Sequence, residues 1–260
     1  MKRIIFSQYT ENVDPHTSVD EYKKSQFLKY NLLLEQKQKE YAHACECDYE
    51  MFKLDITDYA DIQFKKLLRF EELSQQYDEI LYLDLDVAPL KRVSFFEKFD
   101  LNKITAHSLK GTKPRSEYFL YLTENDMWHS MGKYEKTCAK KAMLFLDDII
   151  GDDNIINTGV IGMNKKCVEE LRFSERLDEC KSVFREAKED NIYPSEMANK
   201  WELNNEVFIT YMIERYGLPY TELGMAWNFI VDHEVSKYSA ACHFLHIVNK
   251  NFQDYPIFDN

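Results

Sequence analysis

The stretch YDEILYLDLDVAPL, residues 77–90, joins an apolar strand to two carboxylates. Residues 80–83 are apolar or aromatic, which is typical of a strand buried on both faces of a parallel sheet. Asp84 and Asp86 follow where this strand should end, and open α/β sheets bind ligands at the carboxyl ends of their strands. Residues i and i+2 of a strand share a face, so the two carboxylates would repel unless a cation lies between them. Because hard divalent ions prefer oxygen ligands, the stretch predicts a metal site.

The sequence before this stretch alternates between strand and helix patterns. Apolar runs are separated by segments in which apolar residues recur at helical spacing. In the first predicted helix, Leu28, Leu32, Leu33 and Tyr41 fall on one apolar face. This alternation predicts an α/β fold with a mostly parallel central sheet flanked by helices. The predicted elements are strands at 3–9, 47–55 and 78–87 and helices at 21–43 and 61–76.

The second half of the chain is less regular. We interpret its first part as an insertion that is rich in Lys and Tyr and contains at least one helix. An apolar strand with an unusual Asn-Thr-Gly head comes next, followed by two helices and a last apolar strand. These segments are the insertion at 101–145, the strand at 154–164, helices at 165–190 and 204–217, and the strand at 240–249.

Composition argues against several classes of protein. The 33 basic and 45 acidic residues give a net charge of −12, whereas nucleic-acid binders normally present a basic face. The six cysteines form no CxxC pair, which is typical of free thiols in a reducing compartment. The opening MKRIIFSQYT does not resemble a signal peptide, and no apolar run reaches the roughly 18 residues of a membrane span. We therefore expect a cytoplasmic protein that binds no nucleic acid.

The aspartate pair has two other interpretations. A strand can simply end on an Asp that has a turn-forming neighbour. Phosphotransferases of the haloacid dehalogenase type, which use an Asp nucleophile, also end an apolar strand in Asp-x-Asp. In that type, however, Gly-Thr follows the pair and the strand is usually the first. Here Val87 and Ala88 follow a later strand.

Further short blocks occur in order along most of the chain. Together they resemble the glycosyltransferases of the GT-A fold, and most closely the glycogenin-like family 8. The last block departs from that pattern, because His246 replaces a Gly, the Lys arrives one residue late and a Pro-Trp pair is missing. The blocks are KLLRFEEL (66–73), ILYLDLDV (80–87), NTGV (157–160), NNEVFITYM (204–212), LPYTELGMAWN (218–228) and HFLHIVNK (243–250).

The resemblance implies a metal-dependent transferase with a nucleotide-sugar donor. It makes Asp84 and Asp86 ligands of a Mn²⁺ or Mg²⁺ ion that bridges the donor's two phosphates, with one histidine as the third ligand. Matching HFL to the family's HFxG selects His243, whereas matching Lys250 to the family's Lys favours His246. Residues three apart in a strand point to opposite faces, so one histidine at most reaches the carboxylates. We choose His243 and keep His246 as the alternative.

Two lysines and the first strand are candidate contacts of the donor. The resemblance aims Lys66 at the sugar or at the carboxylates, although a helical lysine is as often solvated. Lys250 would meet the diphosphate as a point charge, and this lysine too has a plain surface interpretation. The donor-binding residues also include Leu85, between the two aspartates, and the end of the first strand at Ser7, Gln8 and Tyr9, where Tyr9 could stack on the nucleotide base.

Two blocks are candidates for contacts with the transferred sugar or the acceptor. Asn157 can donate to and accept from sugar hydroxyls, and Gly159 would let the backbone approach a ligand closely. A plain turn before a strand is the competing interpretation. Asn205 and Glu206 open a predicted helix, where they could contact the sugar or simply cap the helix.

The sequence thus predicts a single GT-A domain over residues 1–260. We expect residues 1–100 to bind the nucleotide sugar, a UDP-sugar by resemblance, and residues 101–260 to bind the acceptor. The reaction would move a hexose to a hydroxyl group of a glycan, a protein or a lipid-linked sugar, and the resemblance favours retention of configuration. The alternatives are the Asp-nucleophile phosphotransferase and a non-catalytic module that binds a sugar or a partner on the same fold.

Overall fold

The computed structural model describes residues 1–10, 21–55, 59–109, 128–190, 192–231, 242–248 and 250–258. Its centre is a six-stranded sheet of order β2-β1-β3-β6-β5-β7. β1 is parallel to β2 and β3, β5 is parallel to β7, and β6 is antiparallel to β3. The mixed, mostly parallel sheet confirms the predicted α/β fold. The strands are β1 (Arg3–Thr10), β2 (Asp48–Leu54), β3 (Glu79–Leu83), β5 (Ile104–Ser108), β6 (Ile156–Asn164) and β7 (Tyr220–Glu222).

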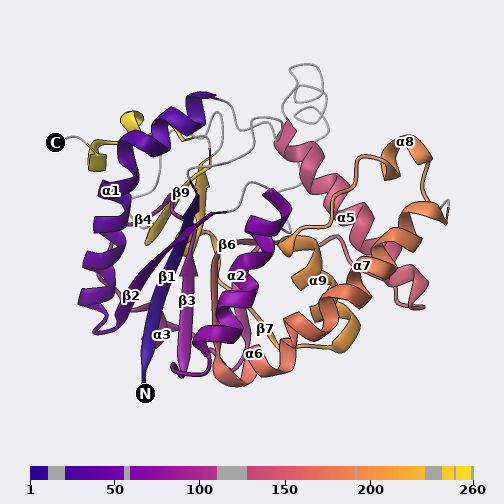
Figure 1. Ribbon diagram of the computed structural model, residues 1–260, viewed down its shortest axis with the longest axis horizontal. Helices are drawn as coiled ribbons and strands as arrows, with labels where there is room; N and C mark the ends of the chain where they lie inside the picture. The colour runs from indigo at the N-terminus through magenta and orange to yellow at the C-terminus, as the bar shows by residue number, and fades with distance from the viewer. Residues whose placement is uncertain are drawn as a thin grey trace. The chain divides into compact units, whose positions relative to one another are not determined.

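Helices accompany the sheet, as the sequence pattern predicts. α1 packs against β2 and α2 against β3, and Figure 1 shows β1 starting at the N-terminus and running upward beside β3. Phe6 of β1 packs its ring against Phe70 of α2 and Tyr82 of β3, which fixes the helix on the sheet. The helices are α1 (Glu21–Ala44), α2 (Tyr59–Leu73), α3 (Phe95–Lys98), α5 (Trp128–Leu146), α6 (Lys165–Leu171), α7 (Phe173–Glu189), α8 (Ser195–Ala198) and α9 (Asn205–Tyr216).

The chain divides into two compact units. The first unit contains residues 1–107, 158–169 and 220–260, and the second contains 108–157 and 170–219. These units do not coincide with the predicted functional halves, because the end of the chain returns to the first unit. The assignment of the halves to donor and acceptor stays a prediction. Within the second unit, α5 packs against α7 and α9.

A second, three-stranded sheet in the first unit changes the predicted course of the chain after β3. Its order is β4-β9-β8, from β4 (Val87–Pro89), β9 (Phe244–Ile247) and β8 (Phe229–Val231). The single strand predicted at 78–87 is therefore two strands, separated by a turn at residues 84–86. Asp84 and Asp86 lie in this turn, so a shared strand face does not explain their proximity.

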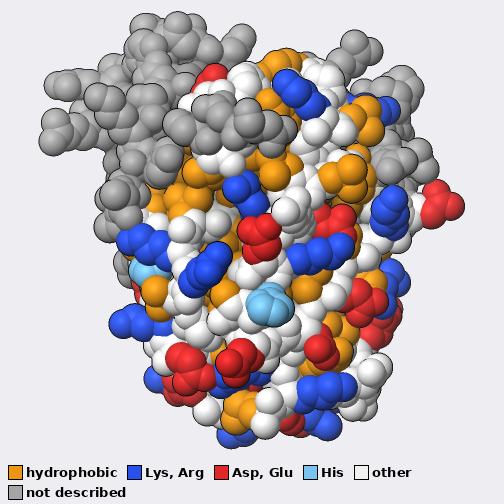
Figure 2. All heavy atoms as spheres, turned by 90° about the vertical axis from the view of Figure 1, so that its left-hand side faces the viewer, with side chains coloured by type: hydrophobic (Ala, Val, Ile, Leu, Met, Phe, Trp, Pro, Cys, Tyr) orange, Lys and Arg blue, Asp and Glu red, His pale blue; other side chains and the backbone are white. Residues whose placement is uncertain are grey.

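The buried face of α1 differs from the predicted one. Leu28 and Leu32 are 55% and 76% exposed, whereas Tyr30, Leu34 and Tyr41 are buried. Three consecutive leucines at 32–34 make the helical pattern ambiguous, and packing against the rest of the unit selects Leu34. Figure 2 shows the opposite, outer side of this part of the molecule, where hydrophobic side chains lie among interleaved basic and acidic ones.

Three further expectations can be compared with the structure. The helix predicted at 165–190 is broken at Arg172, whose backbone is left-handed with φ 49° and ψ 49°, so two helices form. All six cysteines are free. None of the helices in the described ranges is both long and apolar enough to cross a bilayer.

Candidate functional site

The end of β3 and the turn after it position the two aspartates. The Asp84 N–H donates to the carbonyl of Gly159 on the neighbouring β6 at 2.7 Å, which is where β3 leaves the sheet. The Val87 N–H then donates back to the Asp84 carbonyl at 3.0 Å and closes the turn. Asp86 is buried, whereas Asp84 keeps about a third of its side chain exposed.

A buried amide on α1 holds this turn from inside. Gln38 has no exposed surface, and its Nε2 donates to the carbonyls of Asp84 and Val87, both at 2.9 Å. Its Oε1 accepts hydrogen bonds from the hydroxyls of Ser7 and Tyr49. All hydrogen-bonding groups of the amide are thus satisfied in the core, and the turn is tied to α1, β1 and β2.

Gln38→Leu is expected to lower the free energy of unfolding by about 3 kcal/mol, because several buried polar groups would lose their partners at about 1–3 kcal/mol each. Urea unfolding measures the loss. The matched control is Gln36→Leu on the exposed side of the same helix, where we expect a change within about 0.5 kcal/mol. Equal stabilities for the two variants would contradict the bracing role of Gln38.

His246 joins the aspartates through the second sheet. β4 and β9 are antiparallel, and their register sets Val87 opposite His246, while the Ile247 N–H donates to the Asp86 carbonyl at 3.0 Å. The imidazole Nε2 lies 3.4 Å from Asp86 Oδ2 and 3.9 Å from Asp84 Oδ2. One ligand atom from each of the three residues lies within 4.8 Å of the others, so this group can bind a metal ion.

Asn228 orients the imidazole of His246. Its Oδ1 lies 3.0 Å from His246 Nδ1, and both side chains are buried. An amide oxygen only accepts hydrogen bonds, so Nδ1 carries a proton and Nε2 faces the carboxylates, where it could bind a metal ion in its deprotonated form. Metal-binding histidines are commonly oriented in this way by a partner on the second ring nitrogen.

The structure groups His246, and not our first choice His243, with the two aspartates. The Leu90 N–H donates to the His243 carbonyl at 2.8 Å, so His243 lies beside the end of β4 rather than beside Asp86. Three residues of strand separate the two histidines by about 10 Å. The His243 ring stacks on Trp227 with centroids 4.1 Å apart, and burial there, with nearby Lys91 and Lys98, lowers its pKa.

Two lysines lie beside the carboxylates. The resemblance implies such a position for Lys66, whereas the contact of Lys250 with the donor's diphosphate stays a prediction. Lys66 is 1% exposed, and its Nζ lies 3.2 Å from Asp84 Oδ1. Lys250 pairs with Asp86. Burial would raise the pKa of Asp86, but Lys250 and then His246 outweigh burial and hold that pKa well below its ordinary value. Both aspartates are therefore partly neutralised by the protein itself, and the solvated-surface interpretation of Lys66 is wrong.

Gly159 is required by the close approach of His246. A Cβ at this position would lie 2.3 Å from His246 Cε1, 2.8 Å from Nδ1 and 3.0 Å from Asp84 Oδ2. Real Cβ atoms essentially never show contacts under 3.0 Å, so the two approaches to the imidazole exclude a side chain at this position. The Gly of the Asn-Thr-Gly block thus makes room for the imidazole.

The predicted nucleotide-binding residues on β1 differ in how far their side chains are free to contact a nucleotide. The Ser7 side chain has no exposed surface, and its hydroxyl is engaged by Gln38 and the Leu83 carbonyl, which argues against contact with a base. Gln8 is nearly buried and donates to the Ile62 carbonyl at 2.7 Å. Tyr9 is partly exposed beside Phe27, with ring centroids 6.2 Å apart, so its stacking role stays a prediction.

Leu85 lies between the two aspartates and is buried. Its side chain belongs to the apolar cluster that also contains Leu34 and Leu245. It therefore anchors the turn in the core, while a contact between its backbone and the donor stays a prediction.

The second unit holds the remaining predicted residues. Asn204 is the N-cap of α9, accepting from the N–H groups of residues 206 and 207, so the side chains of Asn205 and Glu206 do not cap this helix. Glu206 instead pairs with Lys136 and accepts from Asn157 Nδ2 at 3.1 Å. Asn205 is fully buried, and neither of its amide atoms has a partner within the described residues.

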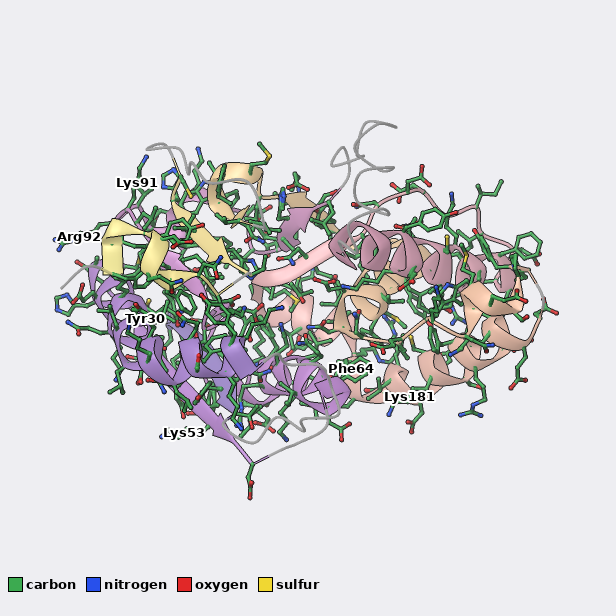
Figure 3. The ribbon with its side chains drawn as sticks, turned by 90° about the horizontal axis from the view of Figure 1, so that it is seen from above. Tyr30, Lys53, Phe64, Lys91, Arg92 and Lys181 are labelled. Atoms are coloured by element: carbon green, nitrogen blue, oxygen red, sulfur yellow. The ribbon has the colours of Figure 1, made fainter. Side chains whose placement is uncertain are left out.

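One surface hollow lies apart from these residues. It has a volume of about 150 Å³ and is bounded by α1 and the segment after β4, including Lys37, Lys91 and Arg92. Figure 3 shows Lys91 and Arg92 projecting outward from one edge of the view. Since none of the predicted site residues lines this hollow, the carboxylates and His246 remain the better candidate site.

Sequence reasoning missed two residues that position the site. Asn228 ends the block at 218–228 that carries part of the resemblance, so a signal for it was present. The sequence gives no signal for the role of Gln38, because a glutamine among the charged residues of a helix usually faces water. Its role becomes visible only in the structure, where Gln38 lies on the buried side of α1 and donates to the turn.

Comparisons with known proteins show the fold. No protein-family model matches the chain, and no curated protein matches it in sequence. The structure is similar to the crystal structure of a glycosyltransferase involved in glycosylation of the major capsid of PBCV-1, with 14% identity, a TM-score of 0.52, and coverage of 98% of this chain and 97% of that chain.

Two other solved structures are similar at lower TM-scores. Galactosyltransferase LgtC, in complex with donor and acceptor sugar analogs, has 12% identity, a TM-score of 0.49, and coverage of 95% of this chain and 87% of that chain. Mouse xyloside xylosyltransferase 1 has 14% identity, a TM-score of 0.46, and coverage of 98% and 99%. The chain therefore shares its α/β fold with a glycosyltransferase and carries an Asp-Asp-His group that is able to bind a metal.

Proposed function

We propose that this chain transfers a hexose from a nucleotide diphosphate sugar, specifically a UDP-sugar, to a hydroxyl acceptor. The observation that carries the proposal is the group of Asp84, Asp86 and His246 at the carboxyl end of β3, in a fold shared with a glycosyltransferase. Two carboxylates and an imidazole whose Nε2 faces them are ligands suited to Mn²⁺ or Mg²⁺. A bound ion would neutralise the donor's diphosphate and assist its departure.

The protein's own cations support the same assignment. Lys66 and Lys250 contact the two carboxylates, so positive charge is already fixed where a diphosphate would bind. Preorganised charge of this kind stabilises a leaving anion without reorganisation during the reaction. We assign Lys250 to the diphosphate and Lys66 to the positioning of Asp84.

Residues of the second unit are proposed contacts of the transferred sugar or the acceptor. Asn205 supports this, because a fully buried amide without a partner among the described residues is unusual unless water or a ligand satisfies it. Asn157 and Glu206 hydrogen-bond to each other and offer polar atoms that suit sugar hydroxyls.

The remaining assignments follow the family resemblance. We propose that residues 1–100 bind the donor and that residues 101–260 bind a glycan, a protein or a lipid-linked sugar. The proposal includes family 8 membership, retention of configuration and a cytoplasmic location.

A nucleotide screen tests the donor. UDP with Mn²⁺ at about 100 times its Kd should stabilise the native state by about 2.7 kcal/mol, which corresponds to roughly 5–10 °C in melting temperature for a chain of this size. ADP, CDP and GDP with Mn²⁺, and UDP with EDTA, should give smaller shifts. Equal shifts for all nucleotides would contradict a base-specific site, and a GDP preference would contradict the UDP assignment.

A non-catalytic binding module is the second candidate. It is favoured by the lysine partners of both aspartates, which neutralise the carboxylates without any metal. Binding of UDP-sugars without hydrolysis or transfer would support it.

The phosphotransferase alternative is disfavoured, because Asp86 is buried against Lys250 and His246. Detection of a trapped aspartyl-phosphate would support this alternative instead.

A further inference from the structure

Hydrogen bonds hold the walls of the surface hollow between α1 and the segment after β4. Its volume is about 150 Å³, and residues 89–92 form one wall. Tyr41 of the opposite wall is 3% exposed and donates its hydroxyl hydrogen to the Val93 carbonyl at 2.8 Å. The Leu90 N–H donates to the His243 carbonyl of β9 at 2.8 Å. The two walls are thus joined to each other and to the second sheet, which fixes the shape of the hollow.

Three cations that have no acidic partner among the described residues line this hollow. Lys37 comes from α1, and Lys91 and Arg92 come from the segment after β4. The chain has 45 acidic and 33 basic residues, so carboxylates are plentiful, and the neighbouring Lys39 does pair with Glu35 at 2.7 Å. The three cations instead converge on one hollow from two different segments, where their charge is available to a ligand.

The hollow remains positive when its acidic residue is counted. Glu40 also lines it and accepts a hydrogen bond from the Gln36 amide at 2.9 Å. Three cations and one carboxylate leave a charge of +2 around the hollow. The same charge is felt in the neighbouring strand, because burial, and then Lys91 and Lys98, lower the pKa of His243.

Size and charge select the ligand of this hollow. A volume of about 150 Å³ is below the roughly 300–1,000 Å³ of pockets that enclose a drug-sized molecule, so one small group fits rather than a nucleotide. The planar fork of Arg92 matches the paired oxygens of a phosphate, and the lysines add point charges. A second hollow, of about 600 Å³, shares Glu40 and Arg92 with the first and offers room for the molecule that carries the phosphate.

We propose that Lys37, Lys91 and Arg92 form a binding site for a phosphate group that is separate from the donor site. Four residues of extended chain, about 13 Å, separate Leu90 from Asp86, so this phosphate is not the donor's diphosphate. The group belongs either to a soluble phosphomonoester or to the headgroup of an acidic phospholipid, since both present the same oxygens. The site does not depend on the proposed transfer reaction.

Nuclear magnetic resonance of the full chain in EDTA tests the site. Titration with inorganic phosphate or with glycerol 3-phosphate should shift the backbone amide signals of residues 37–41 and 90–93. The signals of residues 84–86 should stay unchanged, because the metal group lies apart from the hollow. NaCl at equal ionic strength is the reference, since salt screens exposed charges.

A pair of double variants shows whether these particular cations bind the phosphate. Lys91→Gln combined with Arg92→Gln should raise the Kd of glycerol 3-phosphate about tenfold or more, because hydrogen bonds to charged groups are lost. The matched control, Lys181→Gln combined with Arg185→Gln on α7, removes the same charge and should keep the wild-type Kd. None of the four side chains is buried, so both double variants should fold, and their melting temperatures check this.

Vesicles distinguish the two sources of the phosphate. Sedimentation with phosphatidylcholine vesicles that contain phosphatidic acid, and not with phosphatidylcholine alone, would assign the site to a lipid headgroup. Leu28 and Leu32 of α1, which are 55% and 76% exposed, would then contact the acyl region. Binding of glycerol 3-phosphate without sedimentation would assign the site to a soluble phosphomonoester.

Two results would overturn the inference. The first is the absence of shifts at residues 90–93 with either phosphate compound, together with no binding to acidic vesicles. The second is an equal loss of binding in the two double variants, which would show attraction by net charge alone. Neither result bears on the proposed transfer reaction, which the nucleotide screen tests separately.

Discussion

Asp86→Asn should abolish Mn²⁺ binding and lower the stability of the metal-free protein by about 3 kcal/mol. The loss of binding follows from removing one of three ligands. The loss of stability has a separate cause, since Asp86 is buried against Lys250, and removing one partner of a buried pair leaves an uncompensated charge. Electron paramagnetic resonance of free Mn²⁺ measures binding, and urea unfolding measures stability.

Compensating and control variants separate the two effects. Asp86→Asn combined with Lys250→Gln should recover much of the stability, because the double variant leaves no unpaired lysine charge at this buried position. It should recover none of the metal affinity, because the carboxylate ligand is still missing. Asp178→Asn, at an exposed position of α7, should change neither quantity. Wild-type Mn²⁺ affinity in Asp86→Asn would reject the metal site.

The two histidines provide a second internal comparison. His246→Gln should weaken Mn²⁺ binding strongly, whereas His243→Gln should leave it near the wild-type value. The reason is the register of β4 and β9, which sets His246 beside Asp86 and His243 on Trp227. The opposite ranking would show that the second sheet shifts its register when metal binds.

Gly159→Ala should weaken Mn²⁺ binding about 10- to 100-fold, the usual range for disturbing a residue that orients a ligand. The added methyl group would overlap the His246 ring, which cannot move freely because Asn228 holds its Nδ1. Overpacking of this kind also lowers the free energy of unfolding by about 1–3 kcal/mol. Isothermal titration with Mn²⁺ under conditions where the variant is folded measures the affinity.

The same strand supplies a matched control. A Cβ at Gly162 would lie 2.5 Å from Phe95 Cε1, so Gly162→Ala also overpacks the core but at a distance from the imidazole. It should lose stability and keep its Mn²⁺ affinity. If Gly159→Ala binds Mn²⁺ as tightly as Gly162→Ala does, His246 is not a ligand.

The sequence alone determined the class of fold and the identity of most candidate residues. The apolar run before Asp84 marks a central strand, and regular alternation of strands and helices leaves few arrangements besides an α/β sheet. Both patterns are local, so they can be recognised in the sequence without knowledge of the tertiary contacts. The ordered blocks also pointed to Lys66, Lys250 and the Asn-Thr-Gly segment, all of which lie in or beside the buried site.

Tertiary structure decided which residues meet. The choice of His246 depends on the register between β4 and β9, two segments about 160 residues apart in the chain, and strand register leaves no local signature in a single sequence. The leucines of α1 were assigned to the wrong face because three in a row fit two helical faces equally well. The role of Gln38 is invisible in sequence for a related reason. A polar side chain normally faces water, and only the burial of Gln38 and its hydrogen bonds to two backbone carbonyls show that it holds a turn.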